Sequence, residues 1–264
     1  MSTHDRPVMP GYMSRRTILR GAAFAAGGVL LGSAIEVGGA QTALASSEPQ
    51  VYARAYWGAR SPRRSAQVLG SGPSYIVVHH TFTANTNDHS VNHATALSRA
   101  IQRYHMDVNG WDDIGQQLTI SRGGHILEGR NTSLASIRNG QHAVGAHTAN
   151  HNGHTVGIEN EGTYTWASPP QSLMDALVST CVWLCSAYDL DPGAAIVGHR
   201  DFNPTNCPGD QLYSMLPQLR RDVSARLRSS QAAEPKKEAP EERPTYPDLP
   251  ERERETEHYH GPAA

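Results

Sequence analysis

The chain has 264 residues, a formal net charge of −2 and three cysteines. This length favours one globular domain with tails, and a domain of this size can fold without disulfides. The near-neutral charge, without a basic stripe, argues against nucleic acid as a partner. Three cysteines cannot all pair within one chain, so at least one thiol stays free, and metal binding is a good use for it.

Residues 1–45 have the features of an export signal. Arg15-Arg16 lies in a stretch that resembles the twin-arginine consensus, a weakly apolar Gly/Ala-rich stretch follows, and Ala43 to Ala45 is a small-x-small cleavage site. An uncleaved membrane anchor is the alternative, but Glu36 and the many glycines argue against a spanning helix. We therefore expect twin-arginine export, cleavage near Ser46 and no stable membrane insertion. The mature protein is expected outside the cytoplasmic membrane of a bacterium, secreted or associated with the cell wall.

The folded domain is expected over residues 46–228. Short apolar, β-branched runs bounded by turn residues predict strands at 75–80, 116–120, 125–128, 155–159 and 195–197. Apolar residues at helical spacing predict helices at 91–106, from Pro169 (capped by Ser168) to about 188, and at 211–227 with an interruption at Pro217. This intermixing predicts an α/β single domain with a central mixed β-sheet packed by helices.

The composition changes at residue 229. From there Glu, Pro, Lys and Arg dominate, and aliphatic residues almost disappear. Such a segment cannot bury enough apolar surface to offset the entropy of ordering, so residues 229–264 are predicted to be a disordered charged tail. No long apolar stripe outside the core suggests assembly, and a monomer is expected.

His199 and Cys207 lie eight residues apart in a loop broken by Pro204, and His79 ends the apolar run 75–78. Two imidazoles and one thiolate leave one position open on a tetrahedral zinc, as in catalytic rather than structural sites. Each residue alone is weak evidence, because a histidine at a strand end is often only hydrogen-bonded in the core. A free cysteine is likewise often a small buried hydrophobe.

The other two cysteines and His80, which follows His79, have simpler interpretations. Cys181 and Cys185 lie four residues apart on an apolar helix, so both are expected in the core and are badly placed for a disulfide. Neighbours on a strand point to opposite faces. At most one of His79 and His80 is therefore expected to reach a shared metal.

Eight blocks occur in order along the predicted domain. They are Trp57-Gly58-Ala59-Arg60, Ile76-Val77-Val78-His79-His80-Thr81, Gly110-Trp111-Asp112-Asp113-Ile114-Gly115, Leu127-Glu128-Gly129-Arg130, Gly145-Ala146-His147 with Asn152, Val156-Gly157-Ile158-Glu159, Gly198-His199-Arg200-Asp201, and Thr205-Asn206-Cys207-Pro208-Gly209. Together they resemble the zinc-dependent N-acetylmuramoyl-L-alanine amidases, and the resemblance spans about residues 57–227. This is the amidase-2 family, which includes the peptidoglycan recognition proteins, and the joint order of the blocks is more specific than any one of them.

The resemblance implies a zinc ion, in a surface groove, held by His79, His199 and Cys207. In family members that bind peptidoglycan without cutting it, the cysteine is often replaced, commonly by Ser, so Cys207 favours catalysis. The ligand chemistry agrees, because histidine and cysteine suit zinc better than calcium or magnesium.

One block departs from the family pattern. Many members have Tyr, which assists the attacking water, where this chain has Gln116. A Gln amide cannot act as a general base, and resemblance to other branches of the family transfers that role to Glu159. Two alternatives stay open: Glu159 is only a surface carboxylate, or Glu161 exchanges roles with it.

Further positions carry over from the family. Thr205 is expected either to donate a hydrogen bond to the oxyanion or to satisfy its own turn backbone. Contacts to the substrate, with structural roles as the alternative, are expected from His80, Arg130, His147 and Asn152. A scaffold role is expected from Trp111, Asp113 and Arg60.

The resemblance implies a secreted zinc amidase that hydrolyses the amide between N-acetylmuramic acid and L-alanine in bacterial peptidoglycan. The first alternative is a module that binds peptidoglycan without cutting it, although binding alone does not require the metal ligands or Glu159. A second is another zinc hydrolase that cuts within the stem peptide. A third makes Cys207 a nucleophile with His199 as its base, which leaves His79 without a role.

Overall fold

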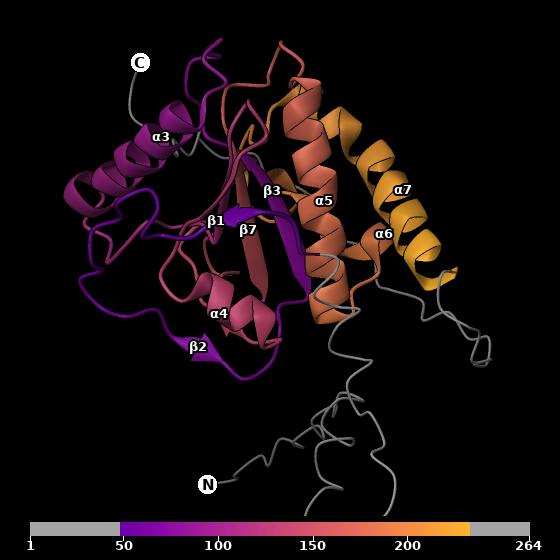
Figure 1. Ribbon diagram of the computed structural model, residues 1–264, viewed down its shortest axis with the longest axis horizontal. Coiled ribbons are helices and arrows are strands. Elements are labelled where there is room, and N and C mark those ends of the chain that lie inside the picture. The colour runs from indigo at the N-terminus through magenta and orange to yellow at the C-terminus, as the bar shows by residue number, and fades with distance from the viewer. Residues whose placement is uncertain (1–47, 233–264) are drawn as a thin grey trace, which may run out of the picture. The chain divides into compact units, whose positions relative to one another are not determined.

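The computed structural model describes residues 48–232 (Figure 1). The strands are β1 (Val51–Tyr52), β2 (Val68–Leu69), β3 (Tyr75–His80), β4 (Leu118–Ile120), β5 (Ile126–Glu128), β6 (His142–Ala143), β7 (Thr155–Asn160) and β8 (Ile196–Gly198). The helices are α3 (Val91–Arg103), the π-helical turn η1 (Tyr104–Val108), α4 (Ser133–Arg138), α5 (Gln171–Tyr188), α6 (Pro192–Ala195), the 3-10 turn η2 (His199–Asp201) and α7 (Asp210–Ala232).

The main sheet has six strands in the order β1-β5-β4-β7-β3-β8. The pair β4–β5 is antiparallel, and the other neighbouring pairs are parallel. Strands β2 and β6 form a separate antiparallel pair. The predicted class, α/β with a central mixed sheet packed by helices, is therefore confirmed.

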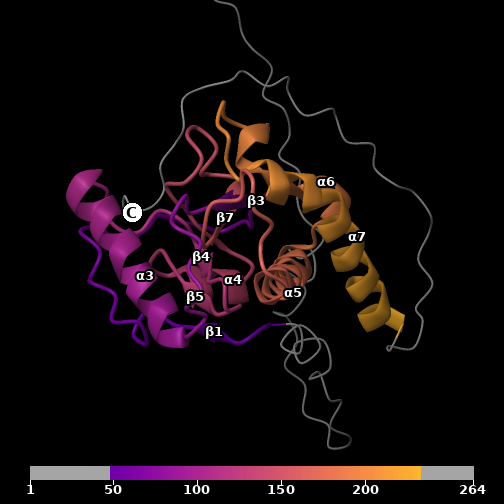
Figure 2. The same cartoon turned by 90° about the horizontal axis from the view of Figure 1, so that it is seen from above.

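Helices cover both faces of the main sheet: α5 and α7 lie on one side and α3 on the other (Figure 2). Alternate residues of a strand point to opposite faces. Ile76 and Val78 of β3, and Ile158 of β7, bury in the main core with residues of α5 and α7. His79 directly follows Val78 and Glu159 directly follows Ile158, so both point to the opposite face of the sheet.

Helix α5 begins two residues later than expected. Its N-cap is Pro170 in an extended conformation without a side-chain cap, so the prediction that Ser168 caps the helix with Pro169 at its first position is wrong. The two consecutive prolines explain the shift, because a residue that precedes a proline is disfavoured in the helical region. Pro169 is therefore not helical, and the helix begins at Gln171, after the extended Pro170.

Pro217 lies inside α7, and the helix continues through it to Ala232, so the predicted interruption is wrong. The proline removes one backbone donor. Leu216 and Leu219, on either side of it, are both buried in the main core. This continuous apolar face outweighs the lost hydrogen bond, and the helix runs four residues past the predicted end of the domain at 228.

The other predicted elements are confirmed within a few residues. The strand predicted at 75–80 is β3, the strands predicted at 116–120 and 125–128 are β4 and β5, and the predicted helix at 91–106 is α3 followed by η1. The two-residue strands β1, β2 and β6 were missed, because two residues are too few to show an alternating pattern.

The predicted export signal at 1–45, its cleavage site, and the part of the predicted tail beyond Ala232 lie outside the described residues. Between residues 48 and 232, no helix combines the length and apolar character needed to cross a membrane.

Candidate metal centre

The three predicted ligands come from three elements that meet at one edge of the sheet. His79 lies near the end of β3, and β8, which pairs with β3 in parallel, leads directly into His199. Because the two strands run the same way, their C-terminal ends lie side by side. Cys207 lies in the loop before α7 and completes the group.

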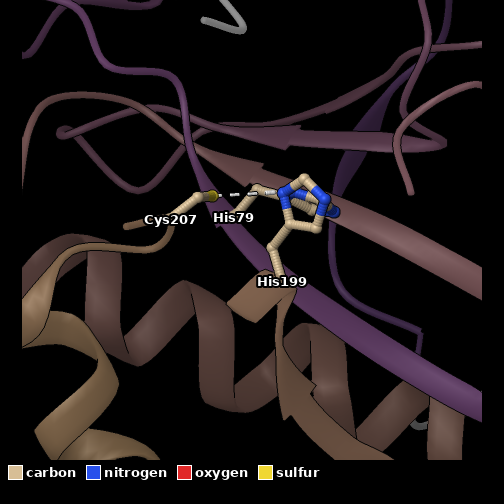
Figure 3. A group of neighbouring side chains, drawn as sticks. All are labelled: His79, His199 and Cys207. Atoms are coloured by element: carbon tan, nitrogen blue, oxygen red, sulfur yellow. Dashed lines mark hydrogen bonds between the residues drawn. The ribbon is translucent and has the colours of Figure 1, made fainter. Parts of the chain in front are cut away.

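The side chains of His79, His199 and Cys207 point toward one another (Figure 3). Their ligand atoms all lie within 4.8 Å of one another. Cys207 Sγ is 3.7 Å from His79 Nδ1, and the two imidazole centroids are 4.5 Å apart. Among residues 48–232 this is the one group of three or more His, Cys, Asp or Glu side chains with such geometry.

The donor set fits a borderline or soft transition metal. Zinc takes imidazole and thiolate ligands, and three protein ligands leave one tetrahedral position open. Burial raises the pKa of the Cys207 thiol well above its ordinary value, and the nearby Glu159 raises it further. A cation at this point would offset both effects by stabilising the thiolate.

The predicted surface groove over these residues is not confirmed. The three side chains are between 0% and 2% exposed. The three candidate ligands therefore lie beneath the surface of the domain, where electrostatic interactions are stronger than in water.

Glu159 lies beside His79 in the sheet. The register of β3 and β7 pairs the two residues, so their side chains point to the same face. The Glu159 side chain is fully buried, which contradicts the alternative of a surface carboxylate. Burial raises the pKa of its carboxyl well above the ordinary value. A buried carboxyl with a raised pKa beside a candidate metal centre is a candidate proton carrier.

Glu161 is engaged elsewhere. Its carboxylate lies 2.6 Å from His93 Nε2 and accepts a hydrogen bond of 2.7 Å from the backbone N–H of Arg122. These contacts tie the end of β7 to α3 and to the β4–β5 turn. The structure therefore favours Glu159 over Glu161 as the carboxyl of the site.

The Gln116 side chain is fully buried. Its Nε2 donates to Thr119 Oγ1 at 2.9 Å, and Thr119 pairs in register with Glu159 across β4 and β7. Gln116 thus supports the strand next to Glu159 without offering a base.

His147 was predicted to contact the substrate, but it lies against His79. It is 4% exposed, with Nδ1 at 3.0 Å from His79 Nε2 and Nε2 at 3.3 Å from the carbonyl oxygen of Thr155. Burial, together with the neighbouring His199, lowers the pKa of His147 to about 3, so the ring is neutral. These contacts favour a positioning role over substrate contact.

Asn152 supports the turn that carries His147. Its side-chain oxygen accepts the backbone N–H groups of His147 and Thr148 at 2.8 and 3.0 Å. Two consecutive N–H groups in a turn need such an acceptor. This contact favours the structural alternative for Asn152.

His80 and Arg130 were also predicted to contact the substrate. His80 is 2% exposed, and its Nδ1 accepts the backbone N–H of Tyr164 at 3.2 Å. Burial, with the charge of Arg200, lowers the pKa of His80 to about 4. Arg130 is half-buried and donates to the carbonyl of Ile114. A structural role is favoured for His80, whereas Arg130 stays a candidate for substrate contact.

Thr205 lies in the Cys207 loop, and its hydroxyl oxygen accepts the N–H of Cys207 at 3.2 Å. This is the turn role expected as one alternative. A hydroxyl that accepts one bond keeps its hydrogen for donation. Both roles of Thr205 are therefore chemically compatible.

The predicted scaffold centres on Asp113. Its fully buried carboxylate pairs with Arg54 at 3.0 Å and accepts bonds from Gln102 Nε2 and the N–H of Asn131. Asp113 thus has the expected scaffold role, but Arg60 is not part of this buried ion pair. Arg60 pairs with Asp107 at the surface instead.

Cys181 and Cys185 lie in the main core as free thiols, as predicted. Asn203 is a site residue that the sequence analysis missed. Its side-chain oxygen lies 3.2 Å from His199 Nε2. The only sequence signal for it is an amide side chain four residues after a ligand histidine.

The family model for N-acetylmuramoyl-L-alanine amidase matches residues 69–210, more than half of the chain. The chain belongs to this amidase-2 family. Human N-acetylmuramoyl-L-alanine amidase is 35% identical over 172 residues, which cover 64% of this chain and 28% of that protein. Peptidoglycan-recognition protein LB of Drosophila melanogaster is 29% identical over 165 residues, 62% of this chain and 66% of that protein.

Solved structures agree with the assignment to the amidase-2 family. Wild-type Drosophila PGRP-LB is 27% identical with a TM-score of 0.55, covering 63% of this chain and 92% of that chain. A point mutant of PGRP-LB, 28% identical with the same TM-score and coverage, was solved in complex with tracheal cytotoxin. The present chain spans only 28–33% of the length of the three curated mammalian amidases that it matches.

Proposed function

We propose that this amidase-2 protein is a secreted zinc enzyme that hydrolyses the amide between N-acetylmuramic acid and L-alanine in bacterial peptidoglycan. The observation that carries the proposal is the cluster of His79, His199 and Cys207 with Glu159 in register beside it. Binding alone requires neither three buried metal ligands nor a neighbouring buried carboxyl. The human and pig relatives are named N-acetylmuramoyl-L-alanine amidase, which supports the choice of this amide as the bond that is hydrolysed.

His79, His199 and Cys207 would hold the zinc. When bound there, zinc supplies Lewis-acid chemistry, because it polarises a carbonyl and lowers the pKa of water from about 15.7 to about 7. Glu159 takes the proton of the attacking water and passes it to the leaving amine. Thr205 donates its hydroxyl hydrogen to the developing oxyanion.

The proposed substrate and the proposed location agree. Peptidoglycan lies outside the cytoplasmic membrane, and the twin-arginine pair Arg15-Arg16 supports export to that side. N-terminal sequencing of the protein from the culture medium or cell wall tests this part, with a mature start near Ser46 as the expected result.

The activity test is a digest of purified peptidoglycan by the zinc-loaded protein, scored for new free α-amino groups on L-alanine. The Cys207→Ser variant is the matched control, because it exchanges sulfur for oxygen and removes one zinc ligand. New L-alanine termini with the wild type and none with the control are expected.

Other outcomes would contradict the proposal in separate ways. New termini on a different residue would move the cut into the stem peptide while keeping a zinc hydrolase. No new termini from folded, zinc-loaded protein that still sediments with peptidoglycan would replace the enzyme by a binding module.

A further inference from the structure

Each of the two ligand histidines has a hydrogen-bond partner on the side of its ring that faces away from Cys207. For His79, Nδ1 lies 3.7 Å from Cys207 Sγ, and Nε2 lies 3.0 Å from His147 Nδ1. A neutral imidazole has one N–H and one lone pair, so a contact at one nitrogen decides what the other nitrogen can do.

The contact made by Nε2 of His147 determines which ring donates in the hydrogen bond between His147 and His79. His147 Nε2 lies 3.3 Å from the carbonyl oxygen of Thr155, and a carbonyl oxygen only accepts. Nε2 of His147 therefore carries the hydrogen, and its Nδ1 carries the lone pair. That lone pair accepts the Nε2–H of His79, with the hydroxyl of Thr148, 2.8 Å away, as a second donor. Nδ1 of His79 then presents a lone pair toward Cys207.

A separate set of contacts gives His199 the same tautomer as His79. The amide nitrogen of Asn203 donates to the carbonyl of Ala149 at 3.3 Å, which fixes the orientation of the amide. The amide oxygen of Asn203 is then the atom at 3.2 Å from His199 Nε2. An amide oxygen only accepts, so His199 carries its hydrogen on Nε2 and its lone pair on Nδ1.

The backbone makes room for His147. A Cβ atom at Gly157 would lie 2.6 Å from Cγ and Nδ1 of His147, and a Cβ atom at Gly145 would lie 2.7 Å from Cδ2 of the same ring. Real Cβ atoms essentially never make contacts this short, so both positions need glycine for the ring to lie against β7. The local sequence is therefore fitted to His147 as well as to the metal ligands.

We propose that His147 and Asn203 are positioning residues of the metal centre, which hold His79 and His199 as Nε2–H tautomers with both Nδ1 lone pairs directed at the ion. The inference rests on the proposed zinc site. Partners of this kind set ring orientation and ligand basicity, and their loss typically costs about 10- to 100-fold in metal affinity.

The first test measures the tautomers in the metal-free, full-length protein. Long-range ¹H–¹⁵N NMR spectra of the histidine rings distinguish Nε2–H from Nδ1–H, with assignments from single-histidine variants. Nε2–H rings are expected for His79, His199 and His147. An Nδ1–H ring at either ligand would overturn the inference without any reference to catalysis.

The second test measures zinc affinity by competition with a chromophoric chelator. His147→Leu and Asn203→Leu remove the acceptors, and each is expected to weaken binding by about 10- to 100-fold. His147→Asn and Asn203→Asp keep an oxygen acceptor near the same place and are expected to restore most of the affinity. Asn206→Ala, in the same loop, is the control expected to bind like the wild type.

Two further measurements separate positioning from general damage. The visible spectrum of the cobalt(II)-substituted protein reports ligand geometry, and it is expected to change in the Leu variants and to recover in the Asn and Asp variants. Gly157→Ala keeps every side chain of the site but displaces the ring of His147. It therefore replaces His147→Leu in the test if that variant fails to fold, and it is expected to show the same loss of zinc affinity.

Unchanged affinity and spectrum in both Leu variants would overturn the inference, as would equal losses in Asn203→Leu and Asn203→Asp. A wild-type protein that binds no zinc would overturn the metal centre itself, and the positioning roles with it.

Discussion

Glu159→Gln is expected to have opposite effects on catalysis and on stability. The substitution keeps the shape of a fully buried side chain next to His79 and removes its ability to take a proton. Loss of a positioned base costs about 10²- to 10⁴-fold in rate. That loss corresponds to about 2.7–5.4 kcal/mol of transition-state stabilisation. The fall is expected in kcat, measured as L-alanine termini released from peptidoglycan at saturating substrate.

The stability effect has the opposite sign. Burial raises the pKa of Glu159 in the folded state, so its contribution to stability is complete below the ordinary Glu pKa and is lost as the pH rises toward the folded value. Gln does not titrate. The metal-free variant is therefore expected to have a higher free energy of unfolding than the wild type near pH 7, and this advantage should disappear near pH 4.

The assay is urea unfolding of both proteins with a chelator present, at the two pH values. A variant that keeps wild-type kcat would refute the base role of Glu159. A variant that gains no stability near pH 7 would refute the reasoning from burial, and a gain that is the same at both pH values would refute the titration argument.

Three other predictions follow from the contacts. Asp113→Ala breaks the buried pair with Arg54 and is expected to cost about 3–5 kcal/mol in urea unfolding, against at most about 1 kcal/mol for the surface carboxylate in Asp107→Ala. Leu177→Ala empties a fully buried position of α5 and is expected to cost about 2–5 kcal/mol, measured in the same way. Zinc at a thousandfold excess over its dissociation constant is expected to raise the free energy of unfolding by about 4 kcal/mol, and Cys207→Ser should lose most of that gain in thermal scans.

The three candidate ligands could be predicted from the sequence because each has a local sequence signal. His79 ends an apolar run that is β3, and His199 follows a second strand that pairs with it. The convergence of the two histidines follows from parallel pairing. Cys207 lies eight residues after His199 in a loop broken by Pro204, and the family resemblance added support to it. Local patterns were weaker where long-range packing decided the outcome, as at Pro217, where core contacts on both sides keep the helix continuous.

The proposed positioning roles of His147 and Asn203 could not be predicted from sequence. His147 lies in a turn, and only the folded structure places that turn against β7, where Thr155 and the empty space at Gly157 orient the ring. From the sequence alone, a histidine in a family block fits a substrate contact equally well. The amide of Asn203 has no distinguishing pattern at all until Ala149 is seen to fix its orientation.

The placement of the site explains why folding and metal binding should be coupled. The same alternation that turns Ile76 and Val78 toward the main core turns His79 and Glu159 to the opposite face, where both are fully buried. Burying titratable groups costs free energy unless they are paired or coordinate a metal. In the metal-free protein, burial raises the pKa values of Cys207 and Glu159 because it disfavours their charged forms. A bound cation would remove part of it, so zinc should stabilise the end of the sheet on which the proposed chemistry depends.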